Sequence, residues 1–246
     1  MKRSGMIFLG VLSLSVAGQE RSQAAAQAGP KSGGVLRFGL SRDITNLNPF
    51  QRANSINKDV GSLAFECLLT SERNGEIKPA LATTWETSKD GLRYTFKLRS
   101  GVKFHNGRDM TVEDIIWSMQ YAMDPKNAAY GKEAFLSVSS LAAPEPLTLQ
   151  VVLREPYVPF LASITGFEAF PVVPKGSVLP RRERMNLYPP GTGPFMMADY
   201  KPNQLIAFKK FDGYWQKGVP YLDAIDRKST RLNSSHIQKS RMPSSA

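Results

Sequence analysis

The chain has 246 residues, 41% of them hydrophobic, with a formal net charge of +11 and one cysteine. A single thiol excludes both an intrachain disulfide framework and a zinc site built from several cysteines. The charge is concentrated at the ends: residues 1–28 carry +2 and residues 226–246 carry +4, which leaves +5 for residues 29–225. No recognisable binding motif accompanies that modest surplus, so we expect no nucleic-acid partner.

Residues 1–28 have the pattern of a secretory signal peptide. Lys2 and Arg3 precede the almost wholly apolar stretch 6–17, which is shorter than the roughly 20 residues that a membrane-spanning helix needs. Small residues suited to a signal peptidase follow at 26–28 and, as an alternative, at 15–17; we expect cleavage after Ala28. An N-terminal core helix is the less favoured interpretation, because no cap or continuing apolar face follows. No cysteine near the cleavage point offers a lipid anchor, which favours a soluble periplasmic protein.

The other end, residues 226–246, changes abruptly in composition. The segment DRKSTRLNSSHIQKSRMPSSA lacks aromatic residues and apolar periodicity, and serine and basic residues dominate it. Composition alone predicts a disordered basic tail. With ordinary codons, however, residues 226–236 and 240–246 can be written as parts of a common short-read sequencing adapter. We therefore interpret the tail, from Asp226 onward, as translated library DNA and expect it to be disordered.

The segments between these ends alternate between strand and helix patterns. Residues 35–40 predict a strand, and the helical spacing of Val60, Leu63, Ala64, Cys67 and Leu68 predicts a helix over 59–69. Alternation over 92–99 after the turn signal Asp90-Gly91 predicts a second strand. Thr111 to Asp114 resembles a helix N-cap, and Asp124-Pro125 ends that helix. A strand at 147–153, a helix at 159–164 and a hairpin of 195–200 with 204–209 follow. This interleaving predicts a mixed α/β fold.

Three candidates for chemistry have stronger structural explanations. Cys67 lies on the apolar face of its predicted helix without a basic neighbour to activate it, so we interpret it as a small core residue. Ser100 and Lys103 fit a Ser-x-x-Lys pattern, but a Gly separates them where a helix is required. His105 has no second ligand at metal spacing. We therefore predict no catalytic set, no protein-built metal site and no cofactor.

One long segment, Leu81 to Met119, resembles the signature of the extracellular family 5 solute-binding proteins, the peptide, dipeptide and nickel binders of ABC transporters. Its sequence is LATTWETSKDGLRYTFKLRSGVKFHNGRDMTVEDIIWSM. Further agreement comes from Asn48-Pro49, Phe65-Glu66, GTGPF at 191–195, Tyr214-Trp215 and Tyr221-Leu222-Asp223. The resemblance covers essentially all of residues 33–225.

The resemblance implies a type II periplasmic-binding-protein fold in its three-domain variant, of which this chain contains only the N-terminal lobe. Residues 29–62 and 186–225 would form the two segments of a base domain, and residues 63–185 would form a domain inserted in it. The opposite lobe, which carries the residues that decide the solute in peptide-binding members, would be absent from this sequence.

The resemblance also implies a function and a few site residues. The loop Ala53-Asn54-Ser55 has the spacing at which peptide-binding relatives run main chain beside the ligand, and Tyr130 resembles a tyrosine that touches it. An ordinary surface loop and a packed aromatic ring are the alternatives. We expect a monomeric receptor that captures short peptides and delivers them to membrane permease subunits. A nickel- or haem-complex receptor and, from another class, a periplasmic hydrolase remain as alternatives.

Overall fold

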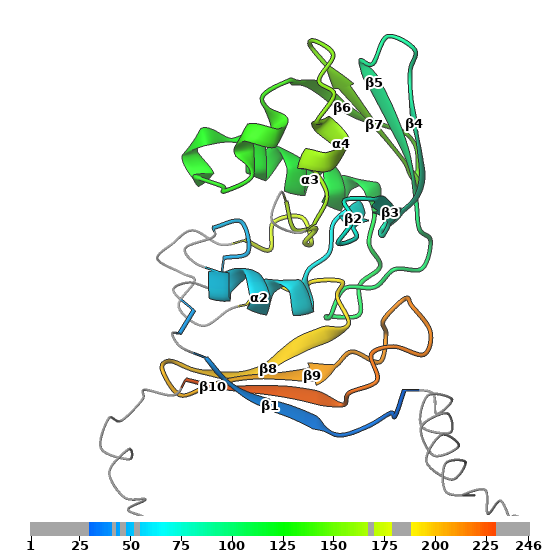
Figure 1. Ribbon diagram of the computed structural model, residues 1–246. Helices are drawn as coiled ribbons and strands as arrows, with labels where there is room; N and C mark the ends of the chain where they lie inside the picture. Colours follow the sequence, from blue (N-terminus) through cyan, green and yellow to red (C-terminus); the bar gives the residue numbers. More distant parts are fainter. Residues whose placement is uncertain are drawn as a thin grey trace, which may run out of the picture.

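The computed structural model describes residues 30–40, 43–44, 48–51, 55–166, 170–178 and 188–229. In this part of the chain, two four-stranded sheets lie on opposite sides of helix α2 (Ser55–Ala64), as Figure 1 shows. None of the helices within these ranges combines the length and apolar character needed to cross a membrane. The alternating strand and helix order confirms the mixed α/β class.

The first sheet, which we call the base sheet, joins the two ends of the described chain. Its strands run in the order β1-β10-β9-β8. β1 and β10 are parallel, with Val35 opposite Ala224, whereas β10 with β9 and β9 with β8 are antiparallel. The strand bounds are Val35–Leu40 for β1, Phe195–Lys201 for β8, Leu205–Lys210 for β9 and Ala224–Ser229 for β10.

One face of the base sheet is buried beneath α2. Phe195, Ile206, Phe208 and Ile225 all lie in the main hydrophobic core. The turn between β8 and β9 uses Asn203 with φ of 57°, a left-handed conformation that asparagine adopts more readily than most residues. The hairpin expected over 195–209 is confirmed.

The second sheet has the order β4-β5-β7-β6, with antiparallel neighbours throughout. Helix α3 (Val112–Met123) and the short helix α4 (Phe160–Ser163) pack on it, and the Phe160 ring lies 4.7 Å from that of Tyr94 in β5. The strands are β4 (Ala82–Thr87), β5 (Arg93–Leu98), β6 (Val138–Glu145) and β7 (Thr148–Leu153). The small pair β2 (Leu69–Ser71) and β3 (Ile77–Pro79) and the 3₁₀ turns η1 (Pro125–Asn127) and η2 (Lys132–Phe135) complete the described elements.

The start of α3 confirms the predicted cap. The Thr111 backbone N–H donates to Asp114 Oδ2 at 2.9 Å, and the Thr111 hydroxyl donates to the same oxygen at 3.1 Å. The other oxygen accepts from Arg108 Nη2 at 2.5 Å and from the Lys175 N–H at 2.8 Å. Burial alone would raise the pKa of the Asp114 carboxyl, but these four donors and the Arg108 charge lower it.

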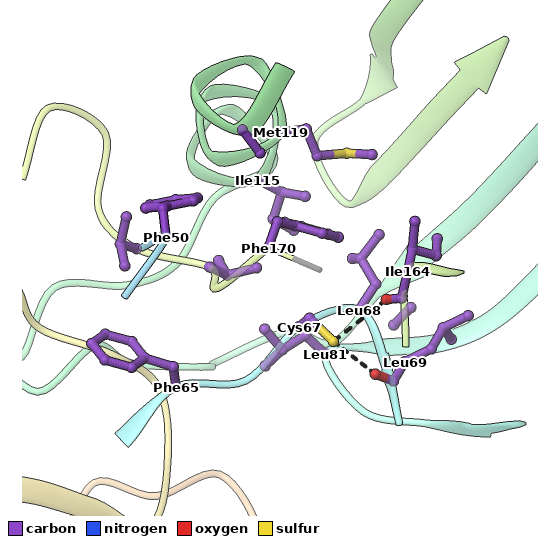
Figure 2. Packing of buried hydrophobic residues seen from close by; sticks show 14 of the residues in the cluster. Phe50, Phe65, Cys67, Leu68, Leu69, Leu81, Ile115, Met119, Ile164 and Phe170 are labelled. Carbon is purple, nitrogen blue, oxygen red and sulfur yellow. Dashed lines mark hydrogen bonds between the residues drawn. The ribbon is translucent and has the colours of Figure 1, made fainter. Parts of the chain in front are cut away.

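The helix predicted over 59–69 is wrong in its bounds, because α2 begins at Ser55 and ends at Ala64. Residues 67 and 68 leave the helix: the carbonyls of Cys67 and Leu68 accept backbone hydrogen bonds from Leu81 and Ala82. Both side chains lie in the main hydrophobic core, so apolar residues outside the helix happened to continue its apolar spacing. Figure 2 shows the Cys67 thiol inside the core, donating to Leu69 O at 2.8 Å. Burial raises the pKa of this thiol to about 12, which confirms it as a buried, unactivated residue.

The expectation of disorder from Asp226 onward is also wrong for its first four residues. Asp226 to Ser229 continue β10 beside β1 and β9. Strand pairing uses the backbone N–H and C=O groups, which every residue except proline provides whatever its side chain. This places Arg227 on the buried face beside Phe38, only 6% exposed. Its Nη2 donates to Asp59 O at a long 3.4 Å, whereas Nε and Nη1 are buried without a hydrogen-bond partner in the described structure. The interpretation of residues 226–246 as translated library DNA remains a prediction, since strand pairing does not reveal the origin of a sequence and residues 230–246 lie outside the described ranges.

Arg227→Ile should therefore stabilise the chain. A buried cation with unsatisfied donors is costly, and replacement of buried charges by apolar side chains stabilises by about 1–4 kcal/mol. The midpoint of thermal unfolding should rise by about 2–4 °C for each kcal/mol. The matched control is Arg37→Ile, since Arg37 lies in the neighbouring strand on the opposite face, with a 70% exposed side chain paired to Asp226. That change should alter stability by less than about 0.5 kcal/mol, and equal effects would contradict the prediction.

Candidate functional site

Of the four residues predicted to contact a solute, the structure describes Ser55 and Tyr130. Ala53 and Asn54 are outside the described residues, and Ser55 is the first residue of α2. Tyr130 lies in the turn between η1 and η2 with 47% of its surface exposed.

The structure brings the Tyr130 turn next to the segment that leads into the predicted loop. The Tyr130 N–H donates to Phe50 O at 2.8 Å, and Gln51 Nε2 donates to Asn127 O at 3.2 Å. Two hydrogen bonds thus join the residues shortly before position 53 to a turn about 80 residues further along the chain.

An aromatic cluster supports this surface from below. Phe50 is 2% exposed, and its ring centroid lies 4.6 Å from that of Tyr121 in α3, which in turn lies 5.2 Å from that of Trp117. Offset aromatic packing of this kind holds rings in defined positions. An exposed phenol ring beside a main-chain segment can contact a ligand by stacking and by backbone hydrogen bonds that are indifferent to side chains. We call Phe50, Gln51 and the Tyr130 turn the candidate ligand surface.

The opposite end of α2 is a tightly packed joint between the two sheets. The Gly193 N–H donates to Ala64 O at 3.0 Å. A Cβ at Gly191 would lie 1.9 Å from that carbonyl oxygen, and one at Gly193 would lie 2.7 Å from the Ala64 carbonyl carbon, so neither position admits a side chain. The glycines of the GTGPF motif are therefore explained by close packing and not by phosphate binding.

His105 locks the same joint through both ring nitrogens. Nε2 lies 2.9 Å from Gly193 O, to which it donates, and Nδ1 accepts from the Gly191 N–H at 3.2 Å. The His105 N–H also donates to Gly191 O at 2.9 Å. Burial lowers the pKa of the imidazole, and its bond to Gly193 O only partly offsets this effect. A neutral ring with both nitrogens engaged has none left for a metal ion.

The other catalytic candidate has no suitable geometry. Lys103 Nζ pairs with Asp109 Oδ1 at 2.6 Å, so its ammonium group is engaged in an exposed ion pair. Within the described ranges, no three His, Cys, Asp or Glu side chains are grouped as metal ligands would be. The arrangement offers packing and hydrogen bonding but no acid, base or nucleophile placed to react.

Two cavities flank the joint. One of about 590 Å³ is lined by His105, Tyr188 and Met197 among others, and one of about 390 Å³ is lined by Glu66, Tyr214 and Trp215 with apolar neighbours. Sequence reasoning noticed Glu66, Tyr214 and Trp215 only as parts of the family resemblance. Glu66 and Tyr214 are separated by 148 residues, so no pattern within a short stretch of sequence could predict their contact.

Residues 76–238 match the family model described as bacterial extracellular solute-binding proteins, family 5 Middle. The chain therefore belongs to this family, and its fold is that of the type II periplasmic-binding proteins. It is 26% identical over 223 residues to the glutathione-binding protein GsiB of Escherichia coli O1:K1, which covers 91% of this chain and 41% of that protein.

Solved structures agree with this assignment. The PBP AgaA of A. tumefaciens R10, in complex with agropinic acid, has a TM-score of 0.74 and 30% identity and covers 80% of this chain and 40% of that one. DppA from Helicobacter pylori, in complex with the peptide STSA, has a TM-score of 0.73 and 26% identity, with 84% and 44% covered. The chain spans less than half the length of each of these relatives.

The contacts of His105 predict a pH-dependent stability. Because the folded state lowers the imidazole pKa below its ordinary 6.5, the unfolded chain binds the proton more readily. Stability should thus be complete above about pH 6.5 and fall as the pH decreases below it, by at most about 1.4 kcal/mol per pH unit. In His105→Gln this contribution to the slope should vanish in urea unfolding measured between pH 7 and pH 5.

The control for that comparison is His236→Gln, which removes the chain's other histidine and leaves the joint intact. It should keep the wild-type pH dependence. A wild-type slope that His105→Gln leaves unchanged would contradict the assignment of this effect to the joint.

Proposed function

We propose that this chain is part of a solute receptor of an ABC importer, which captures short peptides in the periplasm and delivers them to membrane permease subunits. The receptor is a monomer without a cofactor, and its export depends on the signal peptide expected at residues 1–28. The division into a base domain (29–62 and 186–225) and an inserted domain (63–185) belongs to the same proposal.

The observation that carries the proposal is the pairing of an exposed aromatic ring with a main-chain segment at the candidate ligand surface. The Tyr130 N–H bond to Phe50 O brings both sides of that surface together. Peptides share a repeating backbone, so a receptor that accepts varied sequences benefits from backbone hydrogen bonds combined with a ring that stacks on any residue. Support also comes from the family and from a relative solved with a peptide.

Calorimetric titration of the complete receptor with a mixed library of di- to pentapeptides tests the ligand class. Peptide binding supports the proposal, whereas heat from a nickel or haem complex with none from peptides would favour the alternative receptor. Hydrolysis of the peptides during the titration would show instead that the protein is a hydrolase. The 246-residue chain should bind each solute weakly, because one lobe leaves the far side of a ligand in water.

Tyr130→Ala in the complete receptor should reduce peptide affinity about tenfold, the loss expected when a contacting aromatic ring is truncated. The side chain is 47% exposed, so the unfolding midpoint should change little. Tyr157→Ala is the matched control, since this tyrosine is 37% exposed but lies beyond β7, away from α2. Equal peptide affinity in Tyr130→Ala and the wild type would show that the Tyr130 ring does not contribute to peptide binding.

A further inference from the structure

Asn127 lies where the chain leaves α3 and turns toward the candidate ligand surface. It is the last residue of η1, shortly after the end of α3 at Met123. Its side-chain Nδ2 donates back to Tyr121 O at 3.0 Å, and its backbone carbonyl accepts from Gln51 Nε2 at 3.2 Å. One residue thus joins the end of α3 to the segment that contains Phe50.

The bond to Tyr121 O has its cause in the sequence. In a continuous helix this carbonyl would accept from the N–H of residue 125, but that residue is proline and has no N–H to donate. Asp124, which ends α3, already has an extended backbone with ψ of 116°. The Asn127 amide supplies the missing donor, which a side chain with acceptors alone could not do.

The next residue, Ala128, has a left-handed backbone with φ of 47° and ψ of 41°. This conformation is unfavourable for alanine because its Cβ crowds the following carbonyl oxygen, so it persists only where surrounding contacts impose it. The Ala128 N–H donates to Pro125 O at 3.2 Å, and the Tyr130 N–H donates to Phe50 O at 2.8 Å. Ala129 between them is 4% exposed. These contacts hold the turn in one conformation and leave the Tyr130 side chain exposed.

A C-terminal cap of α3 is the other role to consider for Asn127. A cap would require only the bond to Tyr121 O. The backbone carbonyl of Asn127, however, also accepts from Gln51, and the left-handed residue that follows leads the chain back to Phe50. These contacts connect α3 to residues 48–51 and indicate a role beyond ending the helix.

We propose that Asn127 is a positioning residue, which fixes the backbone of Tyr130 against Phe50 and thereby the place of the Tyr130 ring on the candidate ligand surface. A ring that is in place before binding lowers the entropic cost of capturing a solute. This consequence for solute capture rests on the proposed function, whereas the fixed backbone is a property of this chain alone.

Amide hydrogen exchange, measured by nuclear magnetic resonance on the full 246-residue chain, tests the positioning role. Asn127→Asp keeps the shape of the side chain but replaces its N–H donor with a carboxylate, which cannot donate. The Tyr130 N–H should then exchange at least about tenfold faster, because its bond to Phe50 O opens more often. The Leu98 N–H in β5, which donates to Leu147 O at 2.8 Å, should keep its exchange rate within about twofold.

Two further variants separate positioning from a general loss of stability. Asn74→Asp is the matched control, because Asn74 Oδ1 accepts from the Glu76 N–H at 3.0 Å in an exposed turn, and a carboxylate retains that role. It should leave the Tyr130 exchange rate unchanged. Gln51→Met removes the donor to the Asn127 carbonyl and should also accelerate exchange at Tyr130. Combined with Asn127→Asp, its effect on the logarithm of the rate should be less than additive, because both changes weaken the same turn.

Peptide affinity of the complete receptor is the second measurement. Asn127→Asp should lower it about three- to tenfold, and Asn74→Asp should leave it unchanged. Faster exchange at Tyr130 with unchanged peptide affinity would overturn the consequence for solute capture.

A Tyr130 exchange rate that stays at the wild-type value in folded Asn127→Asp, or that rises together with the rate of Leu98, would overturn the positioning role. If Asn127→Asp does not fold, the same result in Gln51→Met would overturn it equally. Exchange is measured without a solute, so its failure leaves the transport proposal standing. Faster exchange in the variants, together with a wild-type receptor that binds no peptide, would contradict the proposed function alone.

Discussion

The close approach of two glycines to the carbonyl of Ala64 determines how the rest of the structure is assembled. Because neither Gly191 nor Gly193 leaves room for a Cβ, the last turn of α2 packs directly against the backbone that leads into β8. His105, from the loop between β5 and α3, then bonds to the same backbone on both sides of Thr192. Three segments distant in sequence thus share one contact, and both sheets take their positions from it.

The structural joint and the proposed ligand surface lie at opposite ends of α2. At its C-terminal end the polar groups of His105 and Glu66 are satisfied by partners within the chain, so this end contributes rigidity. At the other end, the exposed Tyr130 is hydrogen-bonded to the backbone of Phe50, whose ring belongs to a buried aromatic cluster. A rigid support beneath the proposed ligand surface would lower the entropic cost of binding, because fewer protein groups would have to become ordered.

Much of the fold could be predicted where the signal was local. The alternation in 92–99, the cap at Thr111 and the turn at Asn203 each depend on neighbours within a few residues, and the structure confirms them. The end of α2 could not be predicted in this way, because Cys67 and Leu68 are buried by segments far along the chain. The same applies to β10, whose last residues pair through backbone groups despite an unfavourable arginine. Tyr130 is a site prediction that depends on family resemblance alone, and its contact with Phe50 could not be predicted because 80 residues separate the two in sequence.

The parallel pairing of β1 with β10 has a consequence for the order in which the chain folds. Residues 34 and 223 are hydrogen-bonded although 189 positions separate them, so the base sheet cannot close until almost the whole described chain has been synthesised. The second sheet, contiguous from β4 to β7, needs no such delay, and contacts local in sequence form faster than distant ones. During that interval β1 is an unpaired strand with the apolar residues Val35 and Leu36, and unpaired strand edges are prone to pair with other chains.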